Sequence, residues 1–196
     1  MTNKKPLEKQ IVESNFFDLD GIIAKSEGVS CTFEEGELNP EFFPELLAIE
    51  KPTQIPEGFV ADAPLWLIEA VKTARSIHLP ESFCVNMQSV LTADAKNVSL
   101  ARLDQNFYSH GQLLCQLLKE NDPDAAFNLS KCLLTVMTQR LGGIVSNAAN
   151  PSYKADKLDS WEAEVFQEAK KYKDDTEHWM RQESRSATSQ KRKRPN

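Results

Sequence analysis

The sequence lacks any segment suited to a membrane or to secretion. No apolar run approaches the roughly 20 residues that a membrane-spanning helix requires, and the mean hydropathy is −0.47. The first 15 residues contain several charged side chains and no apolar stretch like that of a signal peptide. Glycine and proline number only 7 and 10 among 196 residues, which excludes a low-complexity chain. We therefore expect no membrane interaction and a packed core, in one domain or one domain with a small companion.

The sequence also lacks the motifs of common enzymes and cofactor sites. It contains no Walker-type phosphate loop, no G-x-G-x-x-G turn and no G-x-S-x-G nucleophile elbow. Its four cysteines, Cys31, Cys84, Cys115 and Cys132, form no C-x-x-C pair, so we interpret them as reduced structural thiols. The three histidines lie far apart, which argues against a zinc site. We predict a protein without catalytic activity, metal or cofactor.

Two further candidates for chemistry have simpler structural interpretations. Asp18 and Asp20 superficially match a metal-binding D-x-D pattern, but carboxylates two residues apart in a helix do not face each other. Helix capping explains this pair better. His110 lies on a predicted apolar helix face with no acidic residue evident nearby in sequence, so we expect a hydrogen-bonded core or interface histidine.

Charge is distributed unevenly along the chain, whose formal net charge is −6. The segment 184–196 holds five basic residues and no acidic one, which leaves a net charge of −11 on the rest. Because an acidic body repels phosphate backbones, we expect no autonomous nucleic-acid binding. The segment has no apolar side chain larger than alanine and is predicted to be disordered. Lys191, Arg192, Lys193 and Arg194 have the composition of a nuclear-import patch, the alternative being a solubilising basic end.

The N-terminal part of the chain is irregular. Residues 1–13 are predicted to form a flexible arm, and a capped helical turn is expected to begin within residues 14–18. Residues 28–33 alternate apolar and polar side chains and predict a half-buried strand. Prolines and glycines then interrupt any longer element. We predict a small β-rich domain at 14–60, which is too small to be stable unless it packs against the rest of the chain.

Residues 62–183 are predicted to form a helical domain, because apolar side chains recur three and four residues apart. Asp62 and Asp122 are predicted N-caps, each with a proline in or near the first helical turn. The fold class is therefore mainly α, with a C-terminal helical bundle domain preceded by a small β-containing N-terminal domain. The expected helices span 65–71, 78–91, 97–120, 123–146 and 156–183.

The expected helix at 123–146 carries apolar side chains on two faces. A helix of this kind is covered on two sides. In a bundle of about five helices the bundle itself supplies one cover, and we expect a partner chain to supply the other. One face comprises Ala126, Leu129, Leu133 and Val136, and the second comprises Phe127, Leu134, Leu141 and Val145.

Five short motifs follow one another along the chain: Phe17–Ile23, Ala63–Ile68, His78–Pro80, Asn106–Leu114 and Leu158–Phe166. In this order and at nearly matching spacing, they resemble motifs of the GINS family. The resemblance covers about residues 15–182 and is nearest to the type of GINS subunit in which the small domain comes first. Gly21 and Ala63 depart from the family pattern. The family motifs that they resemble are, in the same order, F-x-L-D-D-I-L, L-P-L-W-L-A, the following LP, FY-x-x-G-x-x-LL and LD-x-x-E-x-x-x-F.

The resemblance implies a non-catalytic structural subunit of a heterotetramer of four related GINS subunits, located in the nucleus. GINS joins the MCM helicase hexamer and a phosphoesterase-like accessory protein to form the active replicative DNA helicase. It acts at initiation and fork progression, where it also contacts replicative polymerase. An alternative that stays open is a helical adaptor subunit of another nuclear multiprotein assembly. The candidate interface or core anchors are Leu65, Trp66, Leu67, Phe107, Tyr108, Leu114, Leu133, Leu134, Val136, Leu141, Trp161 and Phe166.

Overall fold

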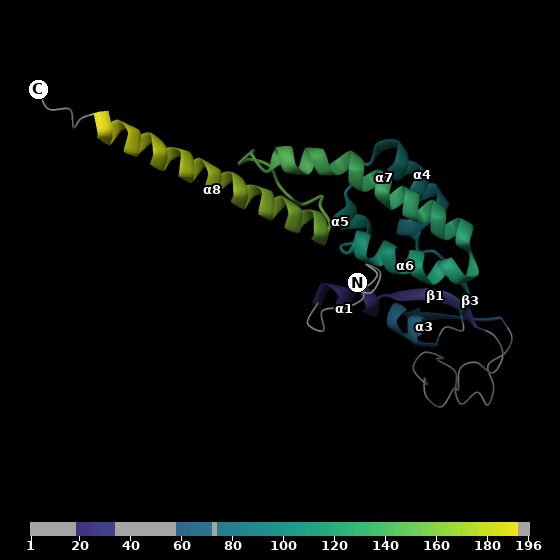
Figure 1. Ribbon diagram of the computed structural model, residues 1–196. Coiled ribbons are helices and arrows are strands. Elements are labelled where there is room, and N and C mark those ends of the chain that lie inside the picture. The colour runs from purple at the N-terminus through teal and green to yellow at the C-terminus, as the bar shows by residue number, and fades with distance from the viewer. Residues whose placement is uncertain (1–18, 34–57, 72–73, 192–196) are drawn as a thin grey trace, which may run out of the picture.

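The chain forms a helical bundle beside a small sheet, as the computed structural model shows for residues 19–33, 58–71 and 74–191 (Figure 1). This arrangement confirms the predicted fold class. The predicted N-terminal arm, the residues expected to cap the first helical turn, and most of the predicted import patch lie outside these ranges. No helix within the described ranges is long and apolar enough to cross a membrane.

The sheet has three antiparallel strands in the order β2-β1-β3. The central strand β1 (Gly28–Phe33) pairs with β2 (Phe59–Pro64) on one side and with β3 (Ala74–Ile77) on the other. The prediction of a half-buried strand at 28–33 is confirmed, because every second side chain of β1 enters the core. Two short helices accompany the sheet, α1 (Leu19–Ser26) and α3 (Leu65–Val71), and both contact the bundle.

Asp62 lies within strand β2, so the prediction that it caps a helix is wrong. It stands opposite Ser30 of β1, whose hydroxyl donates a hydrogen bond to its carboxylate. The strand is favoured because Ala61 and Ala63 bury one face against the core while Asp62 stays exposed between them. The sheet therefore extends beyond residue 60 to Ile77. The division of the chain into domains stays a prediction.

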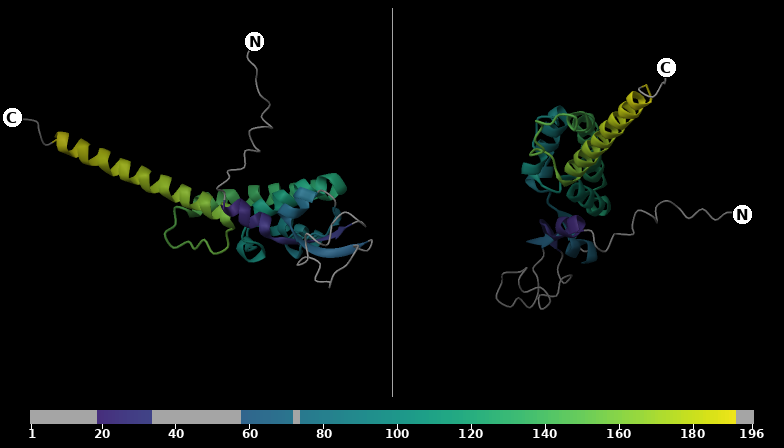
Figure 2. Two further views of the ribbon diagram at one scale, coloured as in Figure 1. Left: turned by 90° about the horizontal axis from the view of Figure 1, so that it is seen from below. Right: turned by 90° about the vertical axis from the view of Figure 1, so that its left-hand side faces the viewer.

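The helical bundle lies against this sheet (Figures 1 and 2). Helices α6 and α7 form its centre, and α4 and α8 pack on α7. The bundle consists of the 3-10 helix η2 (Glu81–Phe83), α4 (Val85–Asp94), α5 (Leu100–Leu103), α6 (Phe107–Asn121), α7 (Pro123–Asn147) and α8 (Ser160–Lys191).

The helix predicted at 97–120 is interrupted between α5 and α6. At the break Asp104 takes an extended backbone conformation, and its Oδ1 accepts a hydrogen bond of 2.8 Å from the backbone N–H of Asn106. Aspartate competes in this way with helical hydrogen bonding, which explains why the helix stops here. The prediction of Asp122 as the N-cap of α7 is confirmed, because its carboxylate accepts from the N–H of Ala125 at 2.9 Å.

Helix α8 is longer than predicted at its C-terminal end. It begins at Ser160, where Oδ1 of Asp159 accepts from the N–H of Glu162 at 2.8 Å, and it runs to Lys191. The prediction of disorder is therefore wrong for residues 184–191. This stretch contains no glycine or proline that would interrupt the helix.

The sheet and the bundle share one hydrophobic core. Phe33 from the sheet belongs to the same buried cluster as Phe83 and Phe107 from the bundle, and the rings of the latter two stack with centroids 4.9 Å apart. This shared core gives the small sheet the support that its size requires. A second, smaller cluster joins α7 to α8 and contains Ile144, Ala148, Leu158 and Phe166.

Candidate assembly surface and charged clusters

Helix α7 is apolar on two separate faces. Because successive residues are about 100° apart around a helix, the centres of the two predicted rows lie roughly 120° apart around α7. The inner face is buried in the core and comprises Ala126, Leu129, Leu133 and Val136. The outer face, which we call the α7 outer stripe, comprises Phe127, Leu134, Leu141 and Val145, with exposed fractions of 68%, 62%, 37% and 50%. One helix thus supplies a core face and a row of exposed apolar side chains.

The twelve predicted anchors separate into two groups. Eight are buried in the core of this chain: Leu65, Leu67, Phe107, Tyr108, Leu114, Leu133, Val136 and Phe166. Four are exposed: Trp66, Leu134, Leu141 and Trp161. Apolar side chains are typical of both protein cores and protein interfaces, so the sequence pattern did not show which anchors are buried and which are exposed. The role of the exposed four at an interface stays a prediction.

Helix α8 projects beyond the bundle (Figures 1 and 2). Its first turns pack on α7 through Phe166, and the ammonium of Lys173 donates to the carbonyl oxygen of Ala149 at 3.1 Å. Further along, Tyr172 and Trp179 are largely exposed, and their spacing of seven residues places them on one side of the helix. The projecting part of α8 therefore presents aromatic side chains to its surroundings.

A buried ion pair fixes the start of α8 against α7. The guanidinium of Arg140 donates to both carboxylate oxygens of Glu162, at 2.7 and 2.8 Å, and also donates to the carbonyl oxygen of Ala95 at 2.6 Å. The Tyr108 hydroxyl donates to Glu162 at 3.0 Å. Burial and the neighbouring Glu162 raise the pKa of Tyr108 above its ordinary value. Burial raises the pKa of Asp159 to about 6.

A second charged cluster surrounds His110 at the junction between the sheet and the bundle. The Nδ1 atom of His110 lies 2.7 Å from Oδ2 of Asp104 and 3.0 Å from Oε2 of Glu27. Burial, followed by repulsion from Asp104, raises the pKa of Glu27. Neither carboxylate was predicted to lie beside His110 from the sequence. Asp104 is only six residues from His110, but an uninterrupted helix would have pointed the two side chains apart, and Glu27 is brought close only by the tertiary fold.

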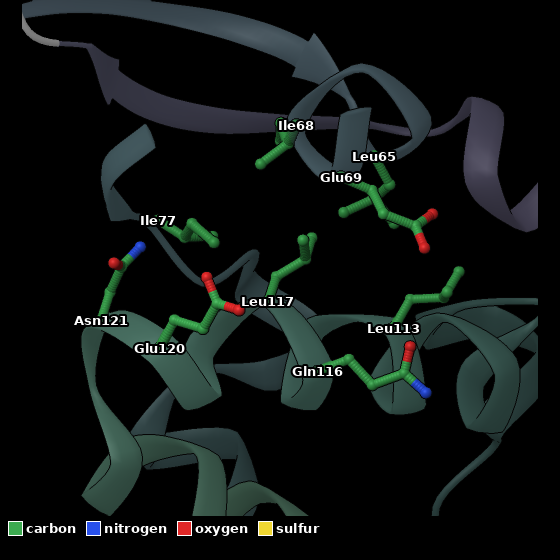
Figure 3. Close-up of a pocket in the computed structure, with 9 residues that line it drawn as sticks. All are labelled: Leu65, Ile68, Glu69, Ile77, Leu113, Gln116, Leu117, Glu120 and Asn121. Carbon is green, nitrogen blue, oxygen red and sulfur yellow. The ribbon is translucent and has the colours of Figure 1, made fainter. Parts of the chain in front are cut away.

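A pocket of about 180 Å³ lies between α3, β3 and α6 (Figure 3). Its floor is apolar, and Figure 3 shows the carboxylates of Glu69 and Glu120 at its border. Glu69 also accepts from the ammonium of Lys25 at 3.2 Å. The lining residues are Leu65, Ile68, Glu69, Ile77, Leu113, Gln116, Leu117, Glu120 and Asn121, which include carboxylates and amides but no nucleophile or histidine.

The four cysteines remain as thiols in the structure. Burial raises the pKa of Cys31 to about 12, which makes it a poor nucleophile near neutral pH. Burial also raises the pKa values of Cys115 and Cys132. These values agree with the interpretation of the cysteines as structural residues.

Comparison with known proteins identifies the family. Residues 82–182 match the family described as the GINS complex protein helical bundle domain (Sld5). Relatives named DNA replication complex GINS protein PSF3 share 29% identity in Bos taurus, 27% in Mus musculus and 25% in Xenopus laevis. Each alignment covers 90% of this chain and 85% of the relative. The matched region includes α7 and most of α8, and the chain belongs to the GINS family.

Proposed function

We propose that this chain is a non-catalytic structural subunit of a GINS heterotetramer. The observation that carries the proposal is the α7 outer stripe, in which four apolar side chains are exposed on a helix whose inner face forms the core. The relatives named above are GINS proteins of the PSF3 type, which supports the same subunit role here. The chain contributes architecture, and its assembly partners are the other three GINS subunits.

The exposed apolar surface is the source of the binding free energy. Burying a large apolar side chain contributes about 1.5–3 kcal/mol. Burial of the α7 outer stripe and of the aromatic residues of α8 would therefore contribute to the binding free energy of an interface, and obligate interfaces typically bury about 2,000 Å² or more in total. Helix–helix packing of this kind requires no catalytic residue or cofactor, which agrees with the absence of enzyme motifs in the sequence.

The proposed role of the tetramer is in DNA replication. In this role GINS joins the MCM hexamer and its phosphoesterase-like accessory protein to form the active replicative helicase, for initiation and fork progression. Contact with replicative polymerase is indirect, through the larger assembly. The net charge of −6 supports a role through protein contacts instead of autonomous nucleic-acid binding. We place the protein in the nucleus.

Co-expression tests this proposal. Expressed alone, the full chain should aggregate or fold poorly, because its apolar helix faces have no cover. With the other three GINS subunits it should purify as a soluble complex with one copy of each subunit, measured by size exclusion with light scattering. A stable monomer that does not bind these subunits would contradict the proposal. Purification with an unrelated set of nuclear partners would instead support the alternative of a helical adaptor in another assembly.

A further inference from the structure

We propose that Glu27, Asp104 and His110 form a binding site for a divalent metal ion of the zinc type. The inference goes beyond the proposed assembly function and does not depend on it. Each of the three residues offers one ligand atom, and these atoms all lie within 4.8 Å of one another. A histidine nitrogen with two carboxylate oxygens is a ligand set that Zn²⁺ accepts. The cluster thus has the ligand count and chemistry of a three-residue metal site.

The ligand atoms need only a small adjustment to hold the ion. With metal–ligand bonds of about 2.0–2.2 Å in tetrahedral geometry, two ligand atoms stand about 3.3 Å apart. The Nδ1 atom of His110 is 2.7 Å from Asp104 and 3.0 Å from Glu27. The required widening is about half an ångström, which rotation of the Glu27 side chain and a small shift of the carboxylates can provide.

The surrounding residues already orient the ligands. The second oxygen of Asp104 accepts from the N–H of Asn106 at 2.8 Å, which holds this carboxylate in place. The ring of His110 packs edge-on against Phe83 with centroids 5.4 Å apart. His110 is only 3% exposed, and its Nε2 has no hydrogen-bond partner among the described residues. The polar partners that the structure gives this buried ring are therefore the two carboxylates.

Charge also favours a cation at this place. Two carboxylates face the one imidazole of His110, at 2.7 and 3.0 Å from its Nδ1 atom. A divalent ion bound to a neutral imidazole balances both carboxylates. The Glu27 side chain is 42% exposed, which gives the ion a path from solvent and leaves room for a water ligand.

The ion would connect two parts of the fold. Glu27 lies in the link between α1 and β1, whereas Asp104 and His110 belong to the α5–α6 region of the bundle. Binding to all three would join the sheet to the bundle, so the site is structural. Its expected effect is to stabilise the folded protein by an amount that rises with the logarithm of the free metal concentration once that concentration exceeds the dissociation constant.

The test uses the full chain without a polyhistidine tag, co-expressed with its partners if it needs them for solubility. Zinc titration by calorimetry is compared for the wild-type protein, Glu27→Gln, Asp104→Asn and the control Glu69→Gln. Glu69 is a suitable control because it is a similarly exposed carboxylate of the same region, at 51% against 42%. Each ligand variant should weaken zinc binding at this site by about tenfold or more, while Glu69→Gln should bind like the wild type.

A second readout separates this site from zinc bound by cysteines elsewhere. Zinc should raise the melting temperature of the wild-type protein and of Glu69→Gln, and it should raise that of Glu27→Gln much less. Because Glu27 is partly exposed, its substitution should leave the fold intact, so this variant decides the test even if Asp104→Asn folds poorly. Absence of zinc binding in the wild type, or binding equal in wild type and Glu27→Gln, would overturn the proposal.

Discussion

Arg140 and Glu162 form a bidentate ion pair in the interior of the protein. Nε and one terminal nitrogen of Arg140 donate to the two carboxylate oxygens of Glu162, and the two side chains are 5% and 1% exposed. The pair connects the second half of α7 to the first turn of α8. Two parallel charge-assisted hydrogen bonds fix both distance and orientation. The direction in which α8 leaves the bundle therefore depends on this contact.

Replacing Glu162 by glutamine should strongly destabilise the protein. The substitution leaves the Arg140 guanidinium buried without its countercharge, at a cost of about 3–5 kcal/mol in the free energy of unfolding. Chemical or thermal unfolding of the purified protein, in its assembly, measures the loss. Glu177→Gln is the control in the same helix. The ion pairs that the structure gives Glu177, with Lys173 and with Arg181, are both exposed, so this substitution should change stability by less than about 1 kcal/mol. Equal effects of the two substitutions would contradict the prediction.

Gly111 allows the close approach of α6 and α7. A Cβ atom at this position would lie 2.9 Å from both terminal carbons of Leu133 and 3.1 Å from the ring of Phe83. Gly111→Ala should therefore lower the free energy of unfolding by about 1–3 kcal/mol. Gly143→Ala is the control, since a Cβ there meets nothing within 4 Å and alanine should stabilise the helix by up to about 1 kcal/mol. If Gly111→Ala left the free energy of unfolding unchanged, the packing of α6 against α7 at this position would be looser than the structure indicates.

Leu134 and Val136 should fail in different ways when replaced by aspartate. Val136 is fully buried, so Val136→Asp places a carboxylate in the core and should prevent folding. Leu134 is 62% exposed, so Leu134→Asp should leave the secondary structure of the chain unchanged and abolish co-purification with the other subunits. Circular dichroism and pull-down from co-expressing cells distinguish the two outcomes.

Asn128→Asp is the matched control for the α7 outer stripe. Asn128 is exposed on the same helix, about 100° away from Phe127. This substitution adds the same charge and should permit normal assembly. Normal assembly of Leu134→Asp, or loss of assembly in both variants, would contradict the assignment of the stripe as the interface.

The carboxyl group of Asp159 should make stability depend on pH. Its pKa is raised from 3.8 to about 6 by burial. Between these values the folded protein binds more protons at this group than the unfolded chain does, so stability falls as the pH rises through this window and is constant above it. Relative to Asp159→Asn, which does not titrate, the wild type should gain about 2 kcal/mol between about pH 7 and about pH 4.5. The measurement is the unfolding curve of each protein at both pH values. If the wild type and Asp159→Asn show the same change in stability between them, the raised pKa of Asp159 is contradicted.

Deleting residues 191–194 should reduce nuclear accumulation. These residues form a run of four basic side chains, which is the composition that import receptors recognise. Fluorescence microscopy of the tagged chain in cells measures the nuclear fraction, and assembly with purified subunits in vitro should be unchanged. Undisturbed import would show that the protein enters the nucleus with a partner that carries its own signal.

Local patterns in the sequence predicted most of the helices and one strand. The N-cap Asp122 with Pro123 sets the start of α7, and the alternation in 28–33 specifies β1, because both depend on residues adjacent in the chain. Asp62 shows the limit of this reasoning. An aspartate is suited both to a helix cap and to an exposed strand position. Here the segment that contains Asp62 pairs with β1, and it therefore forms a strand.

The amino-acid order alone was enough to establish the helical class, the two apolar faces of α7 and the resemblance to GINS, since periodicity and short motifs are local properties. The tertiary structure decided which anchors are core and which are exposed, and it brought Glu27, Asp104 and His110 together. The physical reason is that the local sequence around an apolar or charged residue is the same whether its side chain is buried or exposed. Only the packing of segments distant in the chain determines what that side chain contacts.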